Sequence, residues 1–414
     1  MKIRTVAVIT SLDTKSIEVA YLAGLLLDFG VQPFIIDVGA KKTQDITADI
    51  DALEIAHSSG HMWESPFDVS KSEMISVLRD GLEILLPELY RNETIDGVIS
   101  FGGLQNTVMS TQAMFALPIG VPKVVVSTVA CGNRTFESVI GSSDILVMSS
   151  ITDFTGRNMI TDTILRNAAA AVAGMVLQTE RKELISEKRV IGVTLMGVVT
   201  KGASAAIELL KEYGYEVLSF HSTGVGGQIL DDLIEQRVID GVLEFSAHEL
   251  VGELFGGYSR GTKNRIGVAA KAGIPQVVTL GALDFLDFNP SSDKFTVEGR
   301  KYIYHNEELV HAKVLRSEAE MIGKEVASRI NKSKGPVVLL VPLKGFRQNT
   351  LPGEPLFNPE IDGIIIEEIE KNLRSDIPVI RVDENINDAA FSLLAAQQIY
   401  KLIQNKLEPG EKHE

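Results

Sequence analysis

The sequence predicts an α/β protein of two Rossmann-like, doubly wound domains with mainly parallel sheets. Short β-branched runs alternate with helical patterns of about 10–15 residues, which is typical of βαβ units. The chain of 414 residues is too long for one ordinary domain. A polar, charged stretch at 178–188 precedes a new apolar strand at 190–195. We therefore expect an N-terminal domain over 1–184 and a C-terminal domain over 185–414.

The two halves repeat similar phrases in the same order. The pairs are 6–10 and 191–195, 30–37 and 214–220, 95–101 and 239–245, and 120–126 and 273–279. We interpret this order as an internal duplication, with an insertion at about 41–70 in the first half. The alternative is that any two Rossmann-like sheets look alike at this level.

Composition and charge exclude several classes of protein. A formal net charge of -15 repels polyanions and argues against a nucleic-acid partner, whereas oriented amides and a lysine can still hold an anionic metabolite. The single cysteine, Cys131, cannot form an internal disulfide, which predicts a reducing compartment. The chain starts directly with a strand, and its longest apolar run, 168–177, is about half of the ~20 residues that cross a bilayer. We therefore expect a cytoplasmic protein with no membrane partner.

The first strand-to-helix turn carries Asp13, Thr14 and Lys15. Ligands of open parallel sheets gather at such turns, where helix amides lack partners. Lys15 places a cation in the first helical turn, which costs ~0.3–1 kcal/mol unless an anion compensates it. A bound phosphate would do so. The alternative is a solvated lysine that pairs with Asp13.

Three further turns in the first half are rich in glycine and hydroxyl groups. The loop after residue 101 offers glycine backbone and a choice of helix caps, and the loops at 127–133 and 149–158 follow later strands. Because parallel strands end at one edge, these turns predict a single phosphate- or nucleotide-binding rim. Its members beyond the first turn are Gly102, Gly103, Asn106 and Thr107 (either of the last two as cap), Thr128 and Gly132.

The second half contains another glycine turn, with Thr223, Gly226 and Gly227, which we interpret as a second anion-accepting turn. After a later strand come His248 and Glu249, which suit acid–base catalysis or a metal. No HExxH motif supports the metal, so a capping or structural hydrogen bond is the alternative.

A loop rich in proline and glycine spans 343–359. We expect it to close over a cleft between the domains, where Lys344 and Arg347 would suit a carboxylate or a phosphate. A rigid connection is the alternative.

Taken together, these turns resemble the Tm-1-like ATP-binding family, also called the UPF0261 family. The phrases that carry the resemblance lie at 12–15, 101–103, 144–158, 221–227, 274–284 and 341–345, so it covers essentially the whole chain. The resemblance implies a two-subdomain Rossmann-like architecture, ATP binding and self-association as a homodimer or higher homo-oligomer. By matching position it implies functional roles for 13–15, Gly102, Gly103 and Glu249. The sequence departs from the family pattern at 104–106 and 346–349.

Two hypotheses follow. In the first, the protein is an enzyme whose interdomain cleft binds ATP with Mg²⁺ and transfers or hydrolyses phosphate on a small phosphorylated or carboxylated metabolite. Lys15 and loop amides would stabilise phosphate charge, Asp13 would hold the metal through water, and Glu249 or His248 would move the proton. In the second, the protein senses a nucleotide and a partner reads its state, without turnover. A nucleotide-independent hydrolase or lyase is a further alternative among enzymes.

Overall fold

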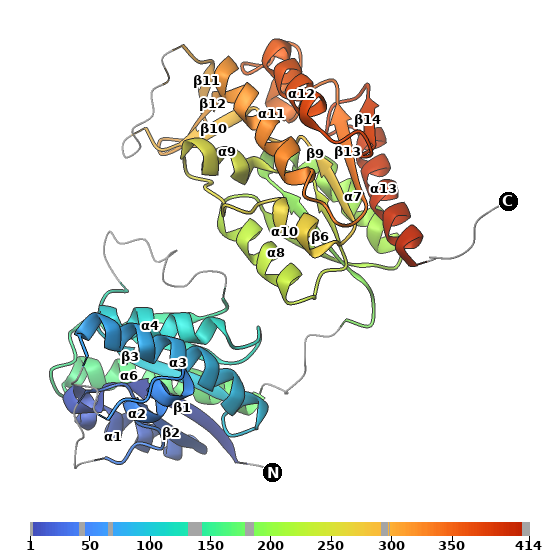
Figure 1. Cartoon of the computed structure of the whole chain (residues 1–414). Coiled ribbons are helices and arrows are strands. Elements are labelled where there is room, and N and C mark those ends of the chain that lie inside the picture. The colour runs from blue at the N-terminus through green and yellow to red at the C-terminus, as the bar shows by residue number, and fades with distance from the viewer. Residues whose placement is uncertain are drawn as a thin grey trace. The chain divides into compact units, whose positions relative to one another are not determined.

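The computed structural model describes residues 3–40, 46–64, 69–130, 143–178, 186–290, 297 and 299–407. The chain divides into two compact units, Met1–Leu184 and Ile185–Glu414, each built on its own sheet (Figure 1). Both main sheets consist of parallel strands with flanking helices. The predicted fold class is therefore confirmed.

The first unit has a five-stranded sheet in the order β2-β1-β3-β4-β5. All of its strand pairs are parallel. The chain moves from β1 to β2 on one side and then crosses to β3 on the other, so the topological switch point lies between β1 and β3. The strands are β1 (Arg4–Thr10), β2 (Val31–Asp37), β3 (Gly97–Gly102), β4 (Lys123–Ser127) and β5 (Leu146–Ser149).

Helices cover both faces of this sheet. One core contains α1 (Leu12–Asp28) and α6 (Met159–Gln178), and the other contains α2 (Ala52–Ser58), α3 (Lys71–Arg91) and α4 (Leu104–Phe115). By length and composition α6 could cross a membrane, yet its apolar side chains at Leu165, Val172 and Val176 lie in the core of the unit. The helix is therefore accounted for by packing, as the sequence predicts for this apolar run.

The second unit has a six-stranded parallel sheet in the order β14-β13-β9-β8-β6-β7. Its strands are β6 (Val190–Leu195), β7 (Glu216–His221), β8 (Gly241–Glu244), β9 (Gln276–Thr279), β13 (Val337–Pro342) and β14 (Val379–Val382). One face packs against α7 (Thr200–Glu212) and α13 (Ala389–Leu407). The other packs against α9 (His248–Phe255), α11 (Arg316–Ile330) and α12 (Pro359–Asn372). The helices α8 (Val225–Glu235) and α10 (Gly267–Ala272) complete the unit, with two short 3-10 turns at Gly197–Val199 and Gln348–Thr350.

A small antiparallel sheet also belongs to the second unit, in the order β10-β12-β11. Its strands are β10 (Phe285–Phe288), β12 (Val310–Lys313) and β11 (Tyr302–Tyr304). The sequence did not predict this sheet, because strands of three or four residues give too few positions for an alternating pattern to stand out.

In both parallel sheets, an aspartate side chain accepts a hydrogen bond from a backbone amide at the start of the first strand. Asp96 Oδ2 accepts a hydrogen bond from Thr5 N at 2.8 Å, and Asp240 Oδ2 accepts one from Val190 N at 2.8 Å. The strand orders β2-β1-β3-β4 and β7-β6-β8-β9 also correspond. Doubly wound sheets in general share such an order, so the duplication stays a prediction.

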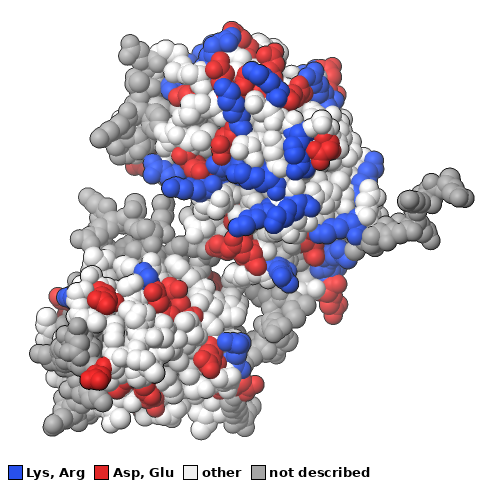
Figure 2. Space-filling model, viewed as in Figure 1, with Lys and Arg blue, Asp and Glu red and all other residues white. Residues whose placement is uncertain are grey.

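Charge is distributed unevenly over the described surface. On the visible face of the second unit, Lys and Arg side chains gather around α10, whereas scattered carboxylates stand out on the visible face of the first unit (Figure 2). The sequence did not indicate this gathering, because no run of basic residues marks it. The net charge of -15 therefore does not describe every part of the surface.

The paired aspartates give a prediction within one chain. Asp96 is 5% exposed and also pairs with Arg4, whereas Asp240 is exposed. We expect Asp96→Ala to destabilise β1 by about 1–3 kcal/mol, since it removes a buried carboxylate that binds both the Thr5 amide and Arg4, and Asp240→Ala to destabilise β6 less. Hydrogen exchange of peptides covering β1 and β6 measures both. Equal effects in the two strands would contradict the assigned role of burial.

Candidate functional site

The ends of β1, β3 and β4 are tied into one rim in the first unit. Thr10 Oγ1 donates to Phe101 O at 2.9 Å, and Thr128 N donates to Gly102 O at 3.1 Å. The hydroxyls of Thr107 and Ser127 lie 2.7 Å apart. Three loops that are distant in sequence are therefore held together at the carboxyl edge of the sheet, beside its switch point.

Helix α4 starts at this rim without a side-chain cap. Its N-cap residue is Gly103, so the prediction of Asn106 or Thr107 as cap is wrong. The reason is that Asn106 Nδ2 turns back to Ser100 Oγ at 2.9 Å and Phe101 O at 2.8 Å, while Thr107 Oγ1 donates to Gly103 O at 2.9 Å. Within the described part of the chain, no side chain accepts a hydrogen bond from the backbone of 102–107. Among the described residues, the first amides of α4 therefore have no side-chain acceptor.

The two glycines of this turn have different roles. Gly102 has φ +153°, and a Cβ there would come 3.1 Å from Asn106 Cβ, so the position favours glycine for packing. A Cβ on Gly103 would meet, among the described residues, only Thr128 Oγ1, at 3.8 Å. Gly103 thus leaves room for close approach to the backbone. Gly132, the remaining predicted member of the rim, lies outside the described residues.

The first turn departs from a regular helix start. Lys15 has φ -139° and ψ 23°, which breaks the helical path within α1. Its Nζ donates to Thr14 Oγ1 at 3.0 Å, and Asp13 Oδ2 accepts from Ala40 N at 3.2 Å. The half-buried Lys15 therefore places a positive charge in the first turn of α1, while Asp13 binds the backbone of the loop after β2.

Sequence reasoning missed Asp37, the last residue of β2. Its Oδ1 accepts from Leu12 N at 2.9 Å and from Gly39 N at 2.8 Å. Burial raises the pKa of this carboxyl, although the two backbone donors oppose the shift. An aspartate at a strand end, two residues before a glycine, is a signal that could have revealed it. The structure shows that the chain itself supplies the acceptor for the amides at 12 and 39.

No group of three or more His, Cys, Asp or Glu side chains in the described ranges is arranged to hold a metal ion. Mg²⁺ commonly needs only one or two protein carboxylates together with substrate phosphates and water. The water-mediated role of Asp13 therefore stays a prediction.

The glycine turn of the second unit holds a carboxylate of its own chain. Glu249 Oε1 accepts from Gly224 N at 2.7 Å and Gly227 N at 2.9 Å. A Cβ on Gly227 would lie 1.9 Å from Glu249 Oε2, and one on Gly226 would lie 2.1 Å from His221 O. These glycines thus make room for internal packing. Thr223 lies in the same turn. The amides of Gly224 and Gly227 in this turn already donate hydrogen bonds to Glu249.

Arg265, which the sequence did not single out, binds this carboxylate and two others. Its Nε lies 2.7 Å from Glu249 Oε2, its Nη1 lies 2.9 Å from Asp231 Oδ1, and its Nη2 contacts Glu244. Burial raises the pKa of Asp231 to about 7, opposed by Arg265 and reinforced by Glu244. Three carboxylates around one guanidinium exceed its charge, which favours a proton on Asp231.

His248 and Glu249 are neighbours in sequence but belong to different clusters. The buried His248 ring stacks on Phe285 with centroids 4.1 Å apart, and its Nδ1 lies 2.8 Å from Ala282 O. Its Nε2 lies 3.3 Å from Asp287 Oδ1. The structure therefore does not bring the two predicted catalytic groups together.

The 343–359 loop is partly built into the second unit. Phe346 is fully buried in the core, and its carbonyl accepts from Ala282 N at 3.0 Å. Arg347 is also fully buried, whereas Lys344 is exposed and donates to Asp383 O at 2.6 Å. The part of the loop that carries Arg347 is therefore a packed element of this unit, because an aromatic side chain anchors it.

Sequence comparisons follow the same division into two parts. Residues 4–181 match the "Uncharacterised protein family (UPF0261) N-terminal domain", and 188–403 match the C-terminal domain of that family. The chain belongs to the UPF0261 family. A UPF0261 protein of Clostridium tetani is 33% identical over 407 residues, which cover 97% of this chain and 99% of that protein.

A second UPF0261 relative is a plant protein. The ToMV resistance protein Tm-1(GCR237) of Solanum lycopersicum is 32% identical over 382 residues, which cover 88% of this chain and 50% of that protein. Among solved structures, a putative UDP-N-acetylglucosamine 2-epimerase from Listeria monocytogenes aligns over 100% of this chain and 99% of its own. Its identity is 14% and its TM-score 0.25, so this likeness carries no argument about function.

The buried acids of this UPF0261 chain predict a pH dependence. Burial raises the pKa of Asp231 from 3.8 to about 7 in the folded protein, so the stability due to its neutral form is complete below about pH 4 and is lost as pH rises to about 7. Asp231→Asn is neutral throughout. We expect the free energy of unfolding of the variant, minus that of the wild type, to rise with pH by up to about 1.4 kcal/mol per unit between about pH 4 and 7. Urea unfolding at several pH values, together with hydrogen exchange of α8, measures this difference. A difference that does not change with pH would contradict the prediction.

Glu249 is tested by two substitutions. Glu249→Gln keeps an oxygen for the amides of Gly224 and Gly227, whereas Glu249→Leu removes every acceptor. We expect the Leu variant to lose about 3–5 kcal/mol and the Gln variant clearly less, because Arg265 keeps two other carboxylates. Urea unfolding of both variants measures the contrast. Equal losses would show that the acceptor role is not what Glu249 contributes.

Proposed function

We propose that the first unit binds a nucleotide, with ATP as the first candidate, at the rim formed by the ends of β1, β3 and β4. The uncapped start of α4 supports this most directly. Its first amides, which no described side chain binds, the open backbone at Gly103 and the hydroxyl of Thr128 together form a set of donors that suits a phosphate group. Lys15 adds the positive charge.

Internal carboxylates already occupy two of the other amide turns, which favours the start of α4 as the place where a phosphate binds. Asp37 already accepts from Leu12 and Gly39, and Glu249 already accepts from the glycine turn of the second unit. The backbone of 102–107 has no such acceptor in the described ranges. An external anion would therefore bind most favourably at the start of α4, where the amides have no carboxylate partner among the described residues. The resemblance to Tm-1-like ATP-binding proteins supports a nucleotide as its source.

The residues present fit a nucleotide phosphate, so the role of each can be stated. Amides of 104–106 and Thr128 would bind phosphate oxygens, Lys15 would balance their charge, and Asp13 would hold Mg²⁺ through water. A bound nucleotide supplies a transferable phosphoryl group. The acid–base role of Glu249 is not supported, since Arg265 and two amides occupy its oxygens. We therefore propose a nucleotide-responsive binding protein in preference to an enzyme that relies on Glu249.

A substitution at Gly103 tests the site. Its φ is -82° and a Cβ would be in ordinary contact, so we expect Gly103→Ala to fold, with a melting temperature lowered by a few degrees because alanine is a poorer N-cap than glycine. The variant should weaken ATP binding at least about tenfold, because the methyl group blocks the approach of phosphate. Thermal shift and calorimetry with ATP, ADP, NAD and inorganic phosphate, with and without Mg²⁺, measure it.

Gly174→Ala is the matched control, because Gly174 lies in α6 of the same unit and a new Cβ there would meet no described atom within 4 Å outside its own helix. This variant should bind ATP as the wild type does. Lys15→Ala should lower the ATP-induced shift without lowering the melting temperature of the free protein. Absence of any shift with adenine nucleotides in the wild type, or equal binding by the two glycine variants, would refute the proposed site.

A further inference from the structure

The small sheet of the second unit has a polar face that is buried. Phe285 pairs with Lys313 and Asp287 pairs with His311 across β10 and β12, so these four side chains share one face. Each is at most 2% exposed. The opposite face, with Leu286, Phe288, Val310 and Ala312, belongs to the apolar core. Burying a polar face is costly unless its groups find partners.

Arg347 lies over this face with its terminal nitrogens unused. Its guanidinium carbon is 4.0 Å from the centre of the Phe285 ring, and its Nε donates to both oxygens of Asp284 at 3.0 and 3.1 Å. Nη1 and Nη2 are fully buried, and neither has a hydrogen-bond partner among the described residues. The four N–H donors on these two nitrogens therefore have no acceptor among the described residues and are available to a ligand.

His311 offers a further unpartnered atom beside Phe285. Its Nδ1 is buried without a hydrogen-bond partner in the described ranges, and its ring centroid is 4.7 Å from that of Phe285. Burial, followed by the charge of Arg347, lowers the pKa of His311 to about 3. Its imidazole is therefore neutral at physiological pH and can donate one hydrogen bond.

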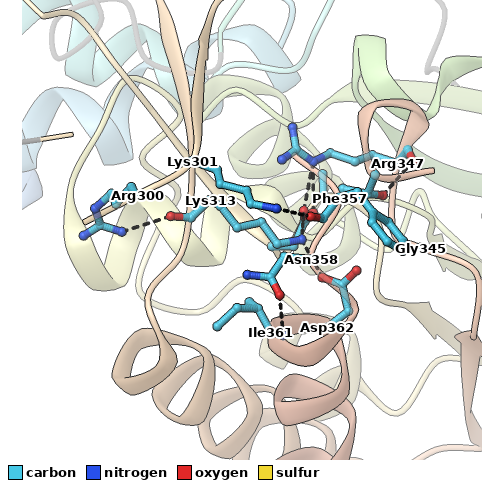
Figure 3. A network of polar contacts seen from close by, with 12 residues as sticks. Arg300, Lys301, Lys313, Gly345, Arg347, Phe357, Asn358, Ile361 and Asp362 are labelled. Atoms are coloured by element: carbon cyan, nitrogen blue, oxygen red, sulfur yellow. Dashed lines mark hydrogen bonds and ion pairs between the residues drawn. The ribbon is translucent and has the colours of Figure 1, made fainter. Parts of the chain in front are cut away.

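The charges around Arg347 decide which anion fits. Lys313 Nζ lies 2.7 Å from Asp284 and 2.6 Å from Asp362, and Arg347 shares Asp284 (Figure 3). Two cations thus face two carboxylates. Burial, reinforced by Asp284, raises the pKa of Asp362 to about 6, so Asp362 can take up one proton near neutral pH when an anion binds beside the cluster. That proton compensates a ligand with a single negative charge, whereas a phosphate dianion would keep one charge uncompensated.

We propose that Arg347 Nη1 and Nη2, assisted by His311 Nδ1, bind the carboxylate of a small organic ligand at the polar face of β10 and β12. A planar carboxylate matches the paired terminal donors of a guanidinium. Phe285 fixes the plane of that guanidinium, and Asp284 orients it from the Nε side. This site belongs to the second unit and is independent of the nucleotide site proposed for the first.

Calorimetry and thermal shift on the full chain test the site with acetate and succinate, and with chloride and inorganic phosphate at equal ionic strength. We expect the carboxylates alone to bind and stabilise the protein. Arg347→Lys keeps a cation for Asp284 but loses the paired donors, and should weaken carboxylate binding about tenfold or more. Arg329→Lys is the matched control, because Arg329 is also buried, at 4% exposed, and its nitrogens already contact Glu325, Glu253 and Arg265 O.

A second variant keeps the test decisive if Arg347→Lys does not fold. His311→Phe preserves a ring against Phe285 and removes only Nδ1 and Nε2, so carboxylate binding should weaken several-fold. In the wild type, succinate should shift the NMR signal of the His311 ring. Binding that is unchanged in these variants, stabilisation by phosphate and chloride equal to that by succinate, or no response to carboxylates would each overturn the proposal.

Discussion

Backbone amides at the carboxyl ends of parallel strands need a negative partner, and this requirement organises both units. Within each unit the chain supplies some of these partners itself: Asp37 accepts from Leu12 and Gly39, and Glu249 accepts from Gly224 and Gly227. In the described part of the rim, the start of α4 has no such carboxylate. Similar strand-loop-helix turns therefore differ in one respect. The amides near Asp37 and Glu249 bind a carboxylate of the chain itself, whereas those at the start of α4 are available to an external anion.

Much of the fold followed from the sequence because it depends on local patterns. β-Branched runs marked the parallel strands, and turn residues marked their ends. The Asp-Gly pairs at 96–97 and 240–241 also occupy the same position in the two units. In each, the aspartate side chain accepts a hydrogen bond from a backbone amide at the start of the first strand. The site followed only in part. Glycine turns signal that a group approaches the backbone closely, but Glu249 lies 22 residues from Gly227, and no local pattern tells an internal carboxylate from a phosphate.

Buried cations were the residues that the sequence described least well. Lys344 and Arg347 lie three positions apart in a loop rich in proline and glycine, yet the first is exposed and the second fully buried. The difference arises because Phe346 anchors the loop in the core and Asp284 neutralises the guanidinium. Arg265 likewise owes its position to three acids from separate segments. Such networks are set by tertiary packing, so residue type alone does not reveal them.

The contrast between open and filled amide turns can be measured in one experiment. Hydrogen exchange of the full chain, with and without ATP and Mg²⁺, reports on 102–107 in the first unit and on 223–227 in the second. Our account predicts that ATP slows exchange in 102–107 and in the turn around Lys15, and leaves 223–227 unchanged because Glu249 already holds those amides. Protection confined to 223–227 would contradict it.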